Sequence, residues 1–266
     1  MPRAKATSAP VLAPTEDTTA SGSSTERSLR VLALLAAQGR ALSLAELSAQ
    51  LGLPKATVHR LCAQLLDAGY LARDLDERQF VAGPALRQLA FDTLNHGVVR
   101  GQRHDVLAAL VKQVGETCNF TTLDGARVLY LDRVEAQWPL RLTLDVGSHV
   151  PLHCTASGKL FLAQLPPAQR RALLAPLTLE RMTRATLTEP EALLAECEQI
   201  AQQGYACDRE EFIPGLIAVA VPVFDAQGRC RAAIAVHAPS ARMTLEQAQT
   251  QLPALQDAAV RMGTLL

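Results

Sequence analysis

The chain has 266 residues, of which 48% are hydrophobic and 4% aromatic. This length allows one or two domains, with cores built mainly from leucine, alanine and valine. Lysine plus arginine and aspartate plus glutamate number 26 each, so the formal net charge is +0. This balance excludes a protein that coats nucleic acid along its whole surface, and any DNA contact must be confined to one module. No segment resembles a signal peptide or a bilayer-spanning run, which predicts a cytoplasmic protein with no membrane partner.

The cysteines do not form a metal site or a disulfide framework. They are widely spaced with no CxxC pair, which argues against bound zinc and predicts reduced thiols. Gly158-Lys159 does not complete a phosphate-binding loop, because Leu160 follows the lysine where a serine or threonine is required. The sequence therefore predicts no cofactor and no metal. The six cysteines are Cys62, Cys118, Cys154, Cys197, Cys207 and Cys230.

Residues 1–24 are rich in alanine, proline, serine and threonine, which predicts a disordered tail. A first helix is predicted immediately after it from an apolar stripe that ends before Gly39. The capping box Ser43-Leu44-Ala45-Glu46 opens a second helix, which ends at Gly52. Pro54 starts a third helix that ends near Asp67. The stripe of the first helix is Leu29, Leu32, Ala33 and Ala36, and that of the second is Leu44, Leu47 and Leu51.

Two short helices joined by a tight glycine turn are typical of a helix-turn-helix. Two short apolar runs follow within residues 70–81, separated by the polar segment 74–78, which predicts a β-hairpin wing. We therefore interpret residues 25–83 as a winged helix-turn-helix DNA-binding domain. Residues 25–82 hold seven basic and six acidic side chains, so the order of the elements supports this interpretation and the charge does not. A solvated helix face in an unrelated helical domain is the alternative.

The third helix has one apolar face, Val58, Leu61, Cys62 and Leu65, and one polar face. On the polar face, long donors can reach base edges and small groups can contact thymine methyls. Basic residues at the helix N-terminus and in the wing suit phosphates. The predicted DNA-binding residues are Ala56, Arg60 and Gln64 on the polar face, Thr57 and His59 at its flanks, Lys55 at the helix start, and Arg73 and Arg78 in the wing. His59 is equally compatible with a position in solvent.

The rest of the chain mixes strand and helix patterns. Residues 84–100 are predicted as a linker helix, and residues 101–266 as an α+β domain with mostly antiparallel strands. Strands are expected at 118–123, 126–133, 140–145, 217–223 and 231–238, and helices at 155–164, 167–175, 189–203 and 245–264. Thr188 with Glu191 and Thr244 with Gln247 are the expected start signals of the last two helices.

Two sets of motifs resemble the IclR family of bacterial transcription regulators, over about residues 24–264. The resemblance implies a GAF-like effector-binding domain, a homodimer or dimer of dimers, and control of an operon by a metabolite through double-stranded operator DNA. The N-terminal motifs are Ser28-Leu29-Arg30-Val31-Leu32, Leu53-Pro54-Lys55-Ala56-Thr57-Val58-His59-Arg60-Leu61 and Gly69-Tyr70-Leu71. The C-terminal motifs are Pro151-Leu152-His153-Cys154-Thr155-Ala156-Ser157-Gly158-Lys159, Gly204-Tyr205, Asp208-Arg209-Glu210-Glu211 and Ala220-Val221-Pro222-Val223.

The residues themselves indicate where a ligand could bind. Thr155-Ala156-Ser157-Gly158 opens a helix with small residues, which leaves the first N–H groups accessible to a carboxylate. Ala233, Ala235 and His237 share one face of a strand, so that an imidazole lies beside open space. His237 can bind a carboxylate or a phenol. A histidine with purely structural partners is the alternative.

The resemblance implies a larger set of effector contacts. These fall on Ala156, Ser157, Asp208, Ala218, Ala235 and His237, with Leu142 and Trp138 as apolar walls. Members of the family with keto-acid ligands tend to have polar or cysteine side chains where this chain has Ala218 and Ala235, which favours a larger and less polar pocket suited to an aromatic acid. We therefore expect a regulator of a catabolic operon that senses a small organic acid and is not an enzyme.

Two other classes of function are open. A hydrolase would use Cys154 as nucleophile, with His153, His149 or His237 as base. Adjacent strand residues point to opposite faces, so His153 is poorly placed to activate Cys154, and cysteine is often simply buried. An interaction scaffold that acts without DNA would not bind its own upstream DNA in a salt-sensitive way.

Overall fold

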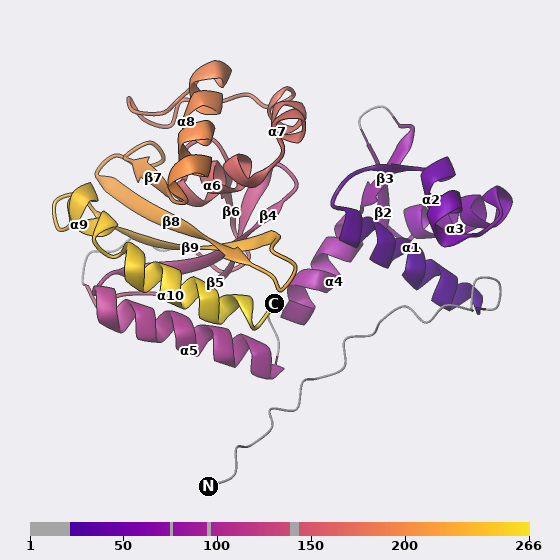
Figure 1. The fold of residues 1–266 in the computed structure, drawn as a ribbon, viewed down its shortest axis with the longest axis horizontal. Coiled ribbons are helices and arrows are strands. Elements are labelled where there is room, and N and C mark those ends of the chain that lie inside the picture. Colours follow the sequence, from indigo (N-terminus) through magenta and orange to yellow (C-terminus); the bar gives the residue numbers. More distant parts are fainter. Residues whose placement is uncertain (1–21, 75–76, 95–96, 139–143) are drawn as a thin grey trace, which may run out of the picture. The chain divides into compact units, whose positions relative to one another are not determined.

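The computed structural model describes residues 22–74, 77–94, 97–138 and 144–266 (Figure 1). The chain divides into two compact units, Met1–Ala90 and Phe91–Leu266. In the part of the chain that the structure describes, no helix is long and apolar enough to cross a bilayer.

The first unit is built on three helices and a small sheet. The helices are α1 (Ser24–Gln38), α2 (Leu44–Leu51) and α3 (Lys55–Asp67). The antiparallel strands are β1 (Leu42–Ser43), β2 (Leu71–Arg73) and β3 (Gln79–Ala82), in the order β1-β3-β2. Helix α4 (Pro84–Leu94) follows the sheet and extends past Ala90, the last residue of this unit. The helix-turn-helix and its hairpin wing are therefore confirmed.

Local signals account for the ends of α2. The side chain of Ser43 accepts a hydrogen bond from the backbone N–H of Glu46, and the Glu46 carboxylate accepts one from the backbone N–H of Ser43, so the capping box is confirmed. Gly52 adopts the left-handed conformation that ends the helix, with φ of 66°. Pro54 is the N-cap of α3 and not its first helical residue.

The predicted apolar stripe of α1 is wrong. Leu29 is 61% exposed, and Val31 and Leu35 are the buried residues of this helix. Both stripes have helical spacing, but the predicted one includes Ala33 and Ala36, which have little apolar area to bury and lie exposed. The larger side chains of the other stripe therefore pack against α2 and α3.

The second unit has a six-stranded antiparallel sheet in the order β6-β5-β4-β9-β8-β7. The strands are β4 (Thr117–Asp124), β5 (Arg127–Val134), β6 (His149–Pro151), β7 (Ala206–Arg209), β8 (Leu216–Phe224) and β9 (Cys230–Pro239). The helices are α5 (Gly97–Val114), α6 (Ala156–Gln164), α7 (Pro167–Leu174), α8 (Pro190–Gln203), α9 (Leu245–Gln249) and α10 (Leu252–Gly263). The predicted linker helix, 84–100, corresponds to α4 and the first residues of α5.

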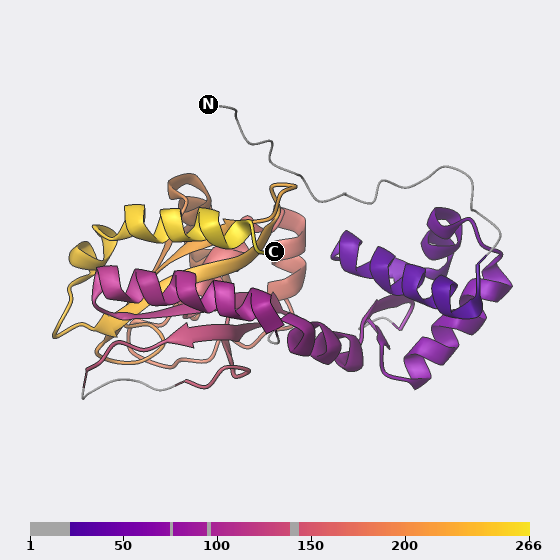
Figure 2. The ribbon, with the colours of Figure 1, turned by 90° about the horizontal axis from the view of Figure 1, so that it is seen from below.

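Helices cover both faces of this sheet (Figures 1 and 2). On one face α5 and α10 lie side by side over branched side chains such as Val219, Ile234 and Val236. On the other face α6 packs over the alanines of β8 and β9, with α8 against α6. Alternate residues of a strand point to opposite faces, so the same two strands provide a bulky core on one side and open space on the other.

Four predicted strands are confirmed, and the differences are local. β6 and β7 are edge strands too short to show alternation. The expected strand 140–145 lies mostly outside the described residues, and its last two residues are not in a strand. The expected helix 245–264 is interrupted between α9 and α10, although its Thr244 capping box is confirmed. Thr188 does not cap α8: the N-cap residue is Glu189, and the hydroxyl of Thr188 accepts a hydrogen bond from Arg181.

Candidate functional site

Helix α3 presents the predicted polar face to solvent. Val58, Leu61 and Cys62 are fully buried, and they fix the rotation of the helix against α1 and α2. On the opposite face Ala56, Arg60 and Gln64 are exposed, as predicted. At its flanks Lys55 and His59 are exposed and Thr57 is half-buried. Their contacts with DNA stay predictions.

The wing places its two arginines differently. The guanidinium group of Arg73 lies 4.3 Å from the centre of the Phe80 ring and donates a hydrogen bond to the backbone oxygen of Glu77. Arg73 is therefore held along the hairpin. Arg78 is exposed, and the Asp74 carboxylate accepts from its backbone N–H. Residues 75 and 76 lie outside the described residues.

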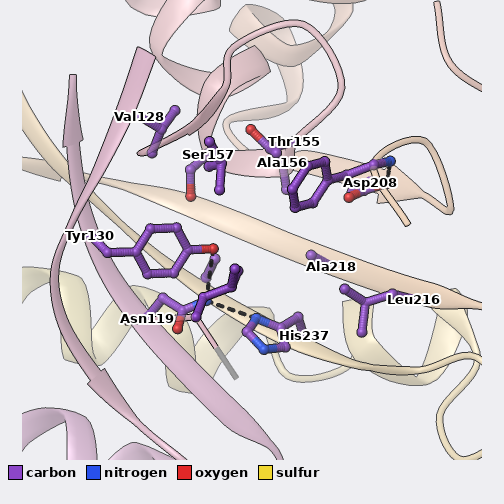
Figure 3. Close-up of a pocket in the computed structure, with 14 residues that line it drawn as sticks. Asn119, Val128, Tyr130, Thr155, Ala156, Ser157, Asp208, Leu216, Ala218 and His237 are labelled. Carbon is purple, nitrogen blue, oxygen red and sulfur yellow. Dashed lines mark hydrogen bonds between the residues drawn. The ribbon is translucent and has the colours of Figure 1, made fainter. Parts of the chain in front are cut away.

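A cavity lies between the start of α6 and the sheet face that carries the alanines (Figure 3). It contains about 410 Å³ of empty space, part of which is open to solvent. The part of this space in which the centre of a water-sized molecule can lie is about 30 Å³. The lining is more apolar than polar, and consists of Asn119, Val128, Tyr130, Leu144, Val150, Thr155, Ala156, Ser157, Asp208, Phe212, Leu216, Ala218, Ala235 and His237.

Six of the eight predicted effector residues line this one cavity: Ala156, Ser157, Asp208, Ala218, Ala235 and His237. Leu142 lies outside the described residues. Trp138 is not part of the lining. Its indole N–H donates to the backbone oxygen of Gly115, and its ring packs against the guanidinium group of Arg242 at 4.7 Å. The predicted role of Trp138 as an apolar wall is therefore not supported by its position.

The start of α6 provides hydrogen-bond donors to the cavity. Thr155 is the N-cap, and its hydroxyl accepts from the N–H of Gly158 and donates to the oxygen of Pro151. The N–H groups of Ala156 and Ser157 belong to the first turn, where a helix has no internal acceptors. A carboxylate placed there is favoured by the helix dipole.

Asp208 is a buried carboxyl group in the cavity wall. Its Oδ1 accepts from the backbone N–H groups of Glu211, at 2.7 Å, and Phe212, at 3.4 Å. Burial, together with the nearby charge of Glu211, raises the pKa of Asp208 to about 7. Near neutral pH this group is therefore present both as an acid that donates a hydrogen bond and as a carboxylate that accepts one.

An ion-pair cluster lies behind Asp208. Lys159 of α6 is completely buried and pairs with Glu211 and, at 3.1 Å, with Glu196 of α8. Arg209 also contacts Glu196, at 2.8 Å. This cluster joins α6, α8 and the connection between β7 and β8, and so fixes the end of β7, which carries Asp208.

The comparisons with known proteins agree with both parts of this arrangement. The model of the IclR helix-turn-helix domain matches residues 24–75, and the model of the bacterial transcriptional regulator IclR C-terminal domain matches residues 91–263. The chain belongs to the IclR family. Its fold is therefore an N-terminal helix-turn-helix followed by an IclR effector domain.

Individual IclR-family relatives match over most of their length. The probable transcriptional regulator SauR of Cupriavidus necator is 46% identical over 236 residues, which are 89% of this chain and 94% of the relative. The transcriptional repressor IclR of Escherichia coli is 30% identical and covers 82% of this chain and 80% of its own. The crystal structure of Thermotoga maritima IclR superposes with a TM-score of 0.61 at 27% identity, over 90% of this chain and 97% of that one.

Membership of the IclR family rules against the hydrolase alternative, because the matched proteins are transcriptional regulators and not enzymes. His153 and Cys154 lie in a turn after β6 and not on a strand, so the predicted opposite orientation of their side chains is wrong in its premise. The nitrogen Nε2 of His153 lies 2.8 Å from the backbone oxygen of Glu180. Burial raises the pKa of the Cys154 thiol to about 12, which leaves it protonated and a poor nucleophile. His149 pairs with Asp124.

Several residues that line the cavity were not predicted from the sequence. Asn119 and Tyr130 supply polar groups from β4 and β5, and Phe212 and Leu216 supply apolar walls. Alternation along the predicted strands determines which residues share a face with Asn119 or Tyr130, but it does not determine which face of the sheet packs against α6. The pairing of β4 with β9 determines this, because it places Asn119 opposite Ala235.

Proposed function

We propose that this IclR-family protein senses a small organic acid in the cavity under α6 and controls a catabolic operon by binding operator DNA as a homodimer or dimer of dimers. The observation that carries the proposal is the composition of the cavity. Its mostly apolar walls enclose donors from the start of α6, from Tyr130 and from His237. An acid with an apolar body fits such a lining.

The sizes of the wall residues favour an aromatic acid over a two- or three-carbon acid. Ala218 and Ala235 leave space next to the donors, and Tyr130 and Phe212 offer ring surfaces to a flat ligand. An IclR homologue from Microbacterium hydrocarbonoxydans was crystallised with 4-hydroxybenzoate; it is 24% identical to this chain and has a TM-score of 0.56. In that protein the same fold holds an aromatic acid.

Calorimetry on the full chain tests the effector class. We expect benzoate and 4-hydroxybenzoate to bind more tightly than glyoxylate, because the apolar ring replaces water at the cavity walls. The control variant is Ala218→Leu, whose larger side chain fills the cavity and should abolish binding. Glyoxylate binding far more tightly than benzoate would contradict the aromatic class, and equal binding by the filled variant would contradict the site.

A further inference from the structure

The orientation of the Asn119 side-chain amide is fixed by its neighbours. Its Oδ1 lies 3.0 Å from Nη1 of Arg133, whose guanidinium group has only donors. The oxygen of the amide must therefore face Arg133, and its NH₂ group must face the other way. Nδ2 lies 2.7 Å from Nδ1 of His237. Arg133 is itself held by Glu135 at 3.2 Å.

This orientation determines the tautomer of His237. Because Asn119 donates to Nδ1, that nitrogen must be the acceptor, and the proton of the neutral imidazole is on Nε2. Burial, together with the positive charge of Arg133, lowers the pKa of His237 to about 3, so the ring is neutral at pH 7. Nε2 is buried and has no hydrogen-bond partner among the residues described.

Tyr130 is arranged by the same amide. Its hydroxyl oxygen lies 3.5 Å from Nδ2 of Asn119 (Figure 3), at the outer limit of a hydrogen bond. Burial raises the pKa of Tyr130 to about 12, so the hydroxyl keeps its proton. Asn119 therefore donates to two atoms, Nδ1 of His237 and the hydroxyl oxygen of Tyr130. Each of these side chains keeps its own proton, which it can donate to a ligand.

We propose that Arg133 and Asn119 are positioning residues that fix His237 as an Nε2–H donor, so that the cavity selects an effector that presents an acceptor atom, such as a carboxylate or carbonyl oxygen, to this nitrogen. A buried donor that is left unpaired is costly, and an acceptor on the ligand removes that cost. The identity of the ligand rests on the proposed function, but the tautomer of His237 does not.

Nitrogen NMR of the full chain with ¹⁵N-labelled histidine tests the tautomer without any ligand. The chain has six histidines, and the signal that is lost in His237→Gln identifies His237. At pH 7 we expect a neutral ring protonated on Nε2. A ring protonated on Nδ1, or on both nitrogens, would overturn the proposal.

Variants of the two positioning residues test their role. Asn119→Asp keeps the shape of the side chain but replaces the donor with an acceptor, and the proton of His237 should then be on Nδ1 or on both nitrogens. Arg133→Met removes the donor that fixes the oxygen of the Asn119 amide, so the Nε2–H tautomer of His237 should no longer dominate. This variant tests the positioning role if Asn119→Asp does not fold. Thr122→Val is the matched control on β4, because its hydroxyl bonds to Arg231 outside the cavity, and it should keep the wild-type tautomer. An unchanged tautomer in the folded variants would overturn the positioning role.

Benzoate and toluene, which differ in the acceptor group, test selection of the ligand. We expect benzoate to shift the Nε2 signal of His237 in the wild type, toluene not to shift it, and Asn119→Asp to weaken benzoate binding by about tenfold or more. Benzoate binding that leaves the signal unchanged would overturn the assigned acceptor. Failure of every acid to bind would instead contradict the proposed effector class, while the NMR of the free protein still decides the tautomer.

Discussion

Among the described residues that line the cavity, Asp208 alone carries a carboxyl group, and its ionisation affects the stability of the effector unit. Its pKa is raised from 3.8 to about 7 by burial and by the charge of Glu211. The folded state therefore holds this proton more tightly than the unfolded chain does. The stability that the protonated group contributes is complete below about pH 4 and is lost as the pH rises through 7.

Asp208→Asn should remove this loss, because the amide keeps the oxygen that accepts from Glu211 and Phe212 but does not ionise. We expect the melting temperature of the variant, relative to that of the wild type, to rise between pH 4 and pH 7 and then to level off. The chain has a single tryptophan, Trp138, in the effector unit, so its fluorescence follows the unfolding of that unit. A difference between variant and wild type that is the same at pH 4.5 and pH 8 would contradict the raised pKa.

At the residue scale the sequence predicted the cavity in part. The small residues at the start of α6, and the alternation that puts Ala235 and His237 on one strand face, can be recognised in the sequence. The structure brings both groups to the same cavity. Asn119, Tyr130 and Arg133 could not be predicted as partners of His237, because their proximity depends on strand register between segments more than 100 residues apart. The ion pair of Lys159 with Glu211, which are 52 residues apart along the chain, was missed because it depends on the packing of α6 against the connection between β7 and β8.

Helix α6 approaches the chain segment before it so closely that one of its residues must be glycine. A Cβ atom on Gly158 would lie 2.2 Å from the backbone oxygen of Leu152. No backbone atom can give way at that distance without moving the helix start, which carries Ala156 and Ser157. The role of this glycine is therefore close packing of backbone against backbone.

Gly158→Ala should destabilise the effector unit by roughly 1–3 kcal/mol or more, as overpacking does, and should weaken acid binding. The matched control is Gly101→Ala in α5, where an added Cβ has no atom within 4 Å and where alanine favours the helix. Thermal unfolding followed at Trp138 compares the two variants. Equal melting temperatures for both variants would contradict the packing argument.

The recognition helix α3 makes a separate prediction. If Arg60 contacts a base, Arg60→Ala should weaken binding to the preferred DNA sequence by about 1–3 kcal/mol and reduce discrimination between sequences. Lys55→Ala should instead weaken binding to all DNA sequences alike and lower the salt dependence of binding. Arg261→Ala, on the exposed side of α10, is the control for loss of one charge. Fluorescence anisotropy with the upstream DNA measures the three variants, and unchanged affinity and discrimination in Arg60→Ala would show that Arg60 does not contact a base.

Elements with strong local signals could be predicted, and those that depend on tertiary pairing could not. The capping boxes at Ser43 and Thr244 are local, and both are confirmed. β6 and β7 have only three and four residues and exist because a neighbouring strand pairs with them. The prediction of the buried stripe of α1 was wrong because its leucines and alanines have helical spacing on two different faces. Only packing against the other helices determines which face is buried.

At the scale of the whole molecule, two units have separate proposed tasks. The helix-turn-helix carries almost no net charge, so we predict that its contacts with DNA are few and local. An effector can change DNA affinity only to the extent that it binds the DNA-bound and free forms differently, and DNA must then change effector affinity by the same factor. The size of the coupling is therefore measurable from either side.

The most direct test is the affinity for the upstream DNA, measured by fluorescence anisotropy with and without saturating benzoate or 4-hydroxybenzoate, in the wild type and in Ala218→Leu. We predict that the acid changes the DNA affinity of the wild type by roughly 5–150-fold, the usual range of such coupling. The filled variant should bind DNA normally and not respond to the acid. A DNA affinity that is unchanged by an acid shown to bind the cavity, or a response that persists in Ala218→Leu, would contradict the account.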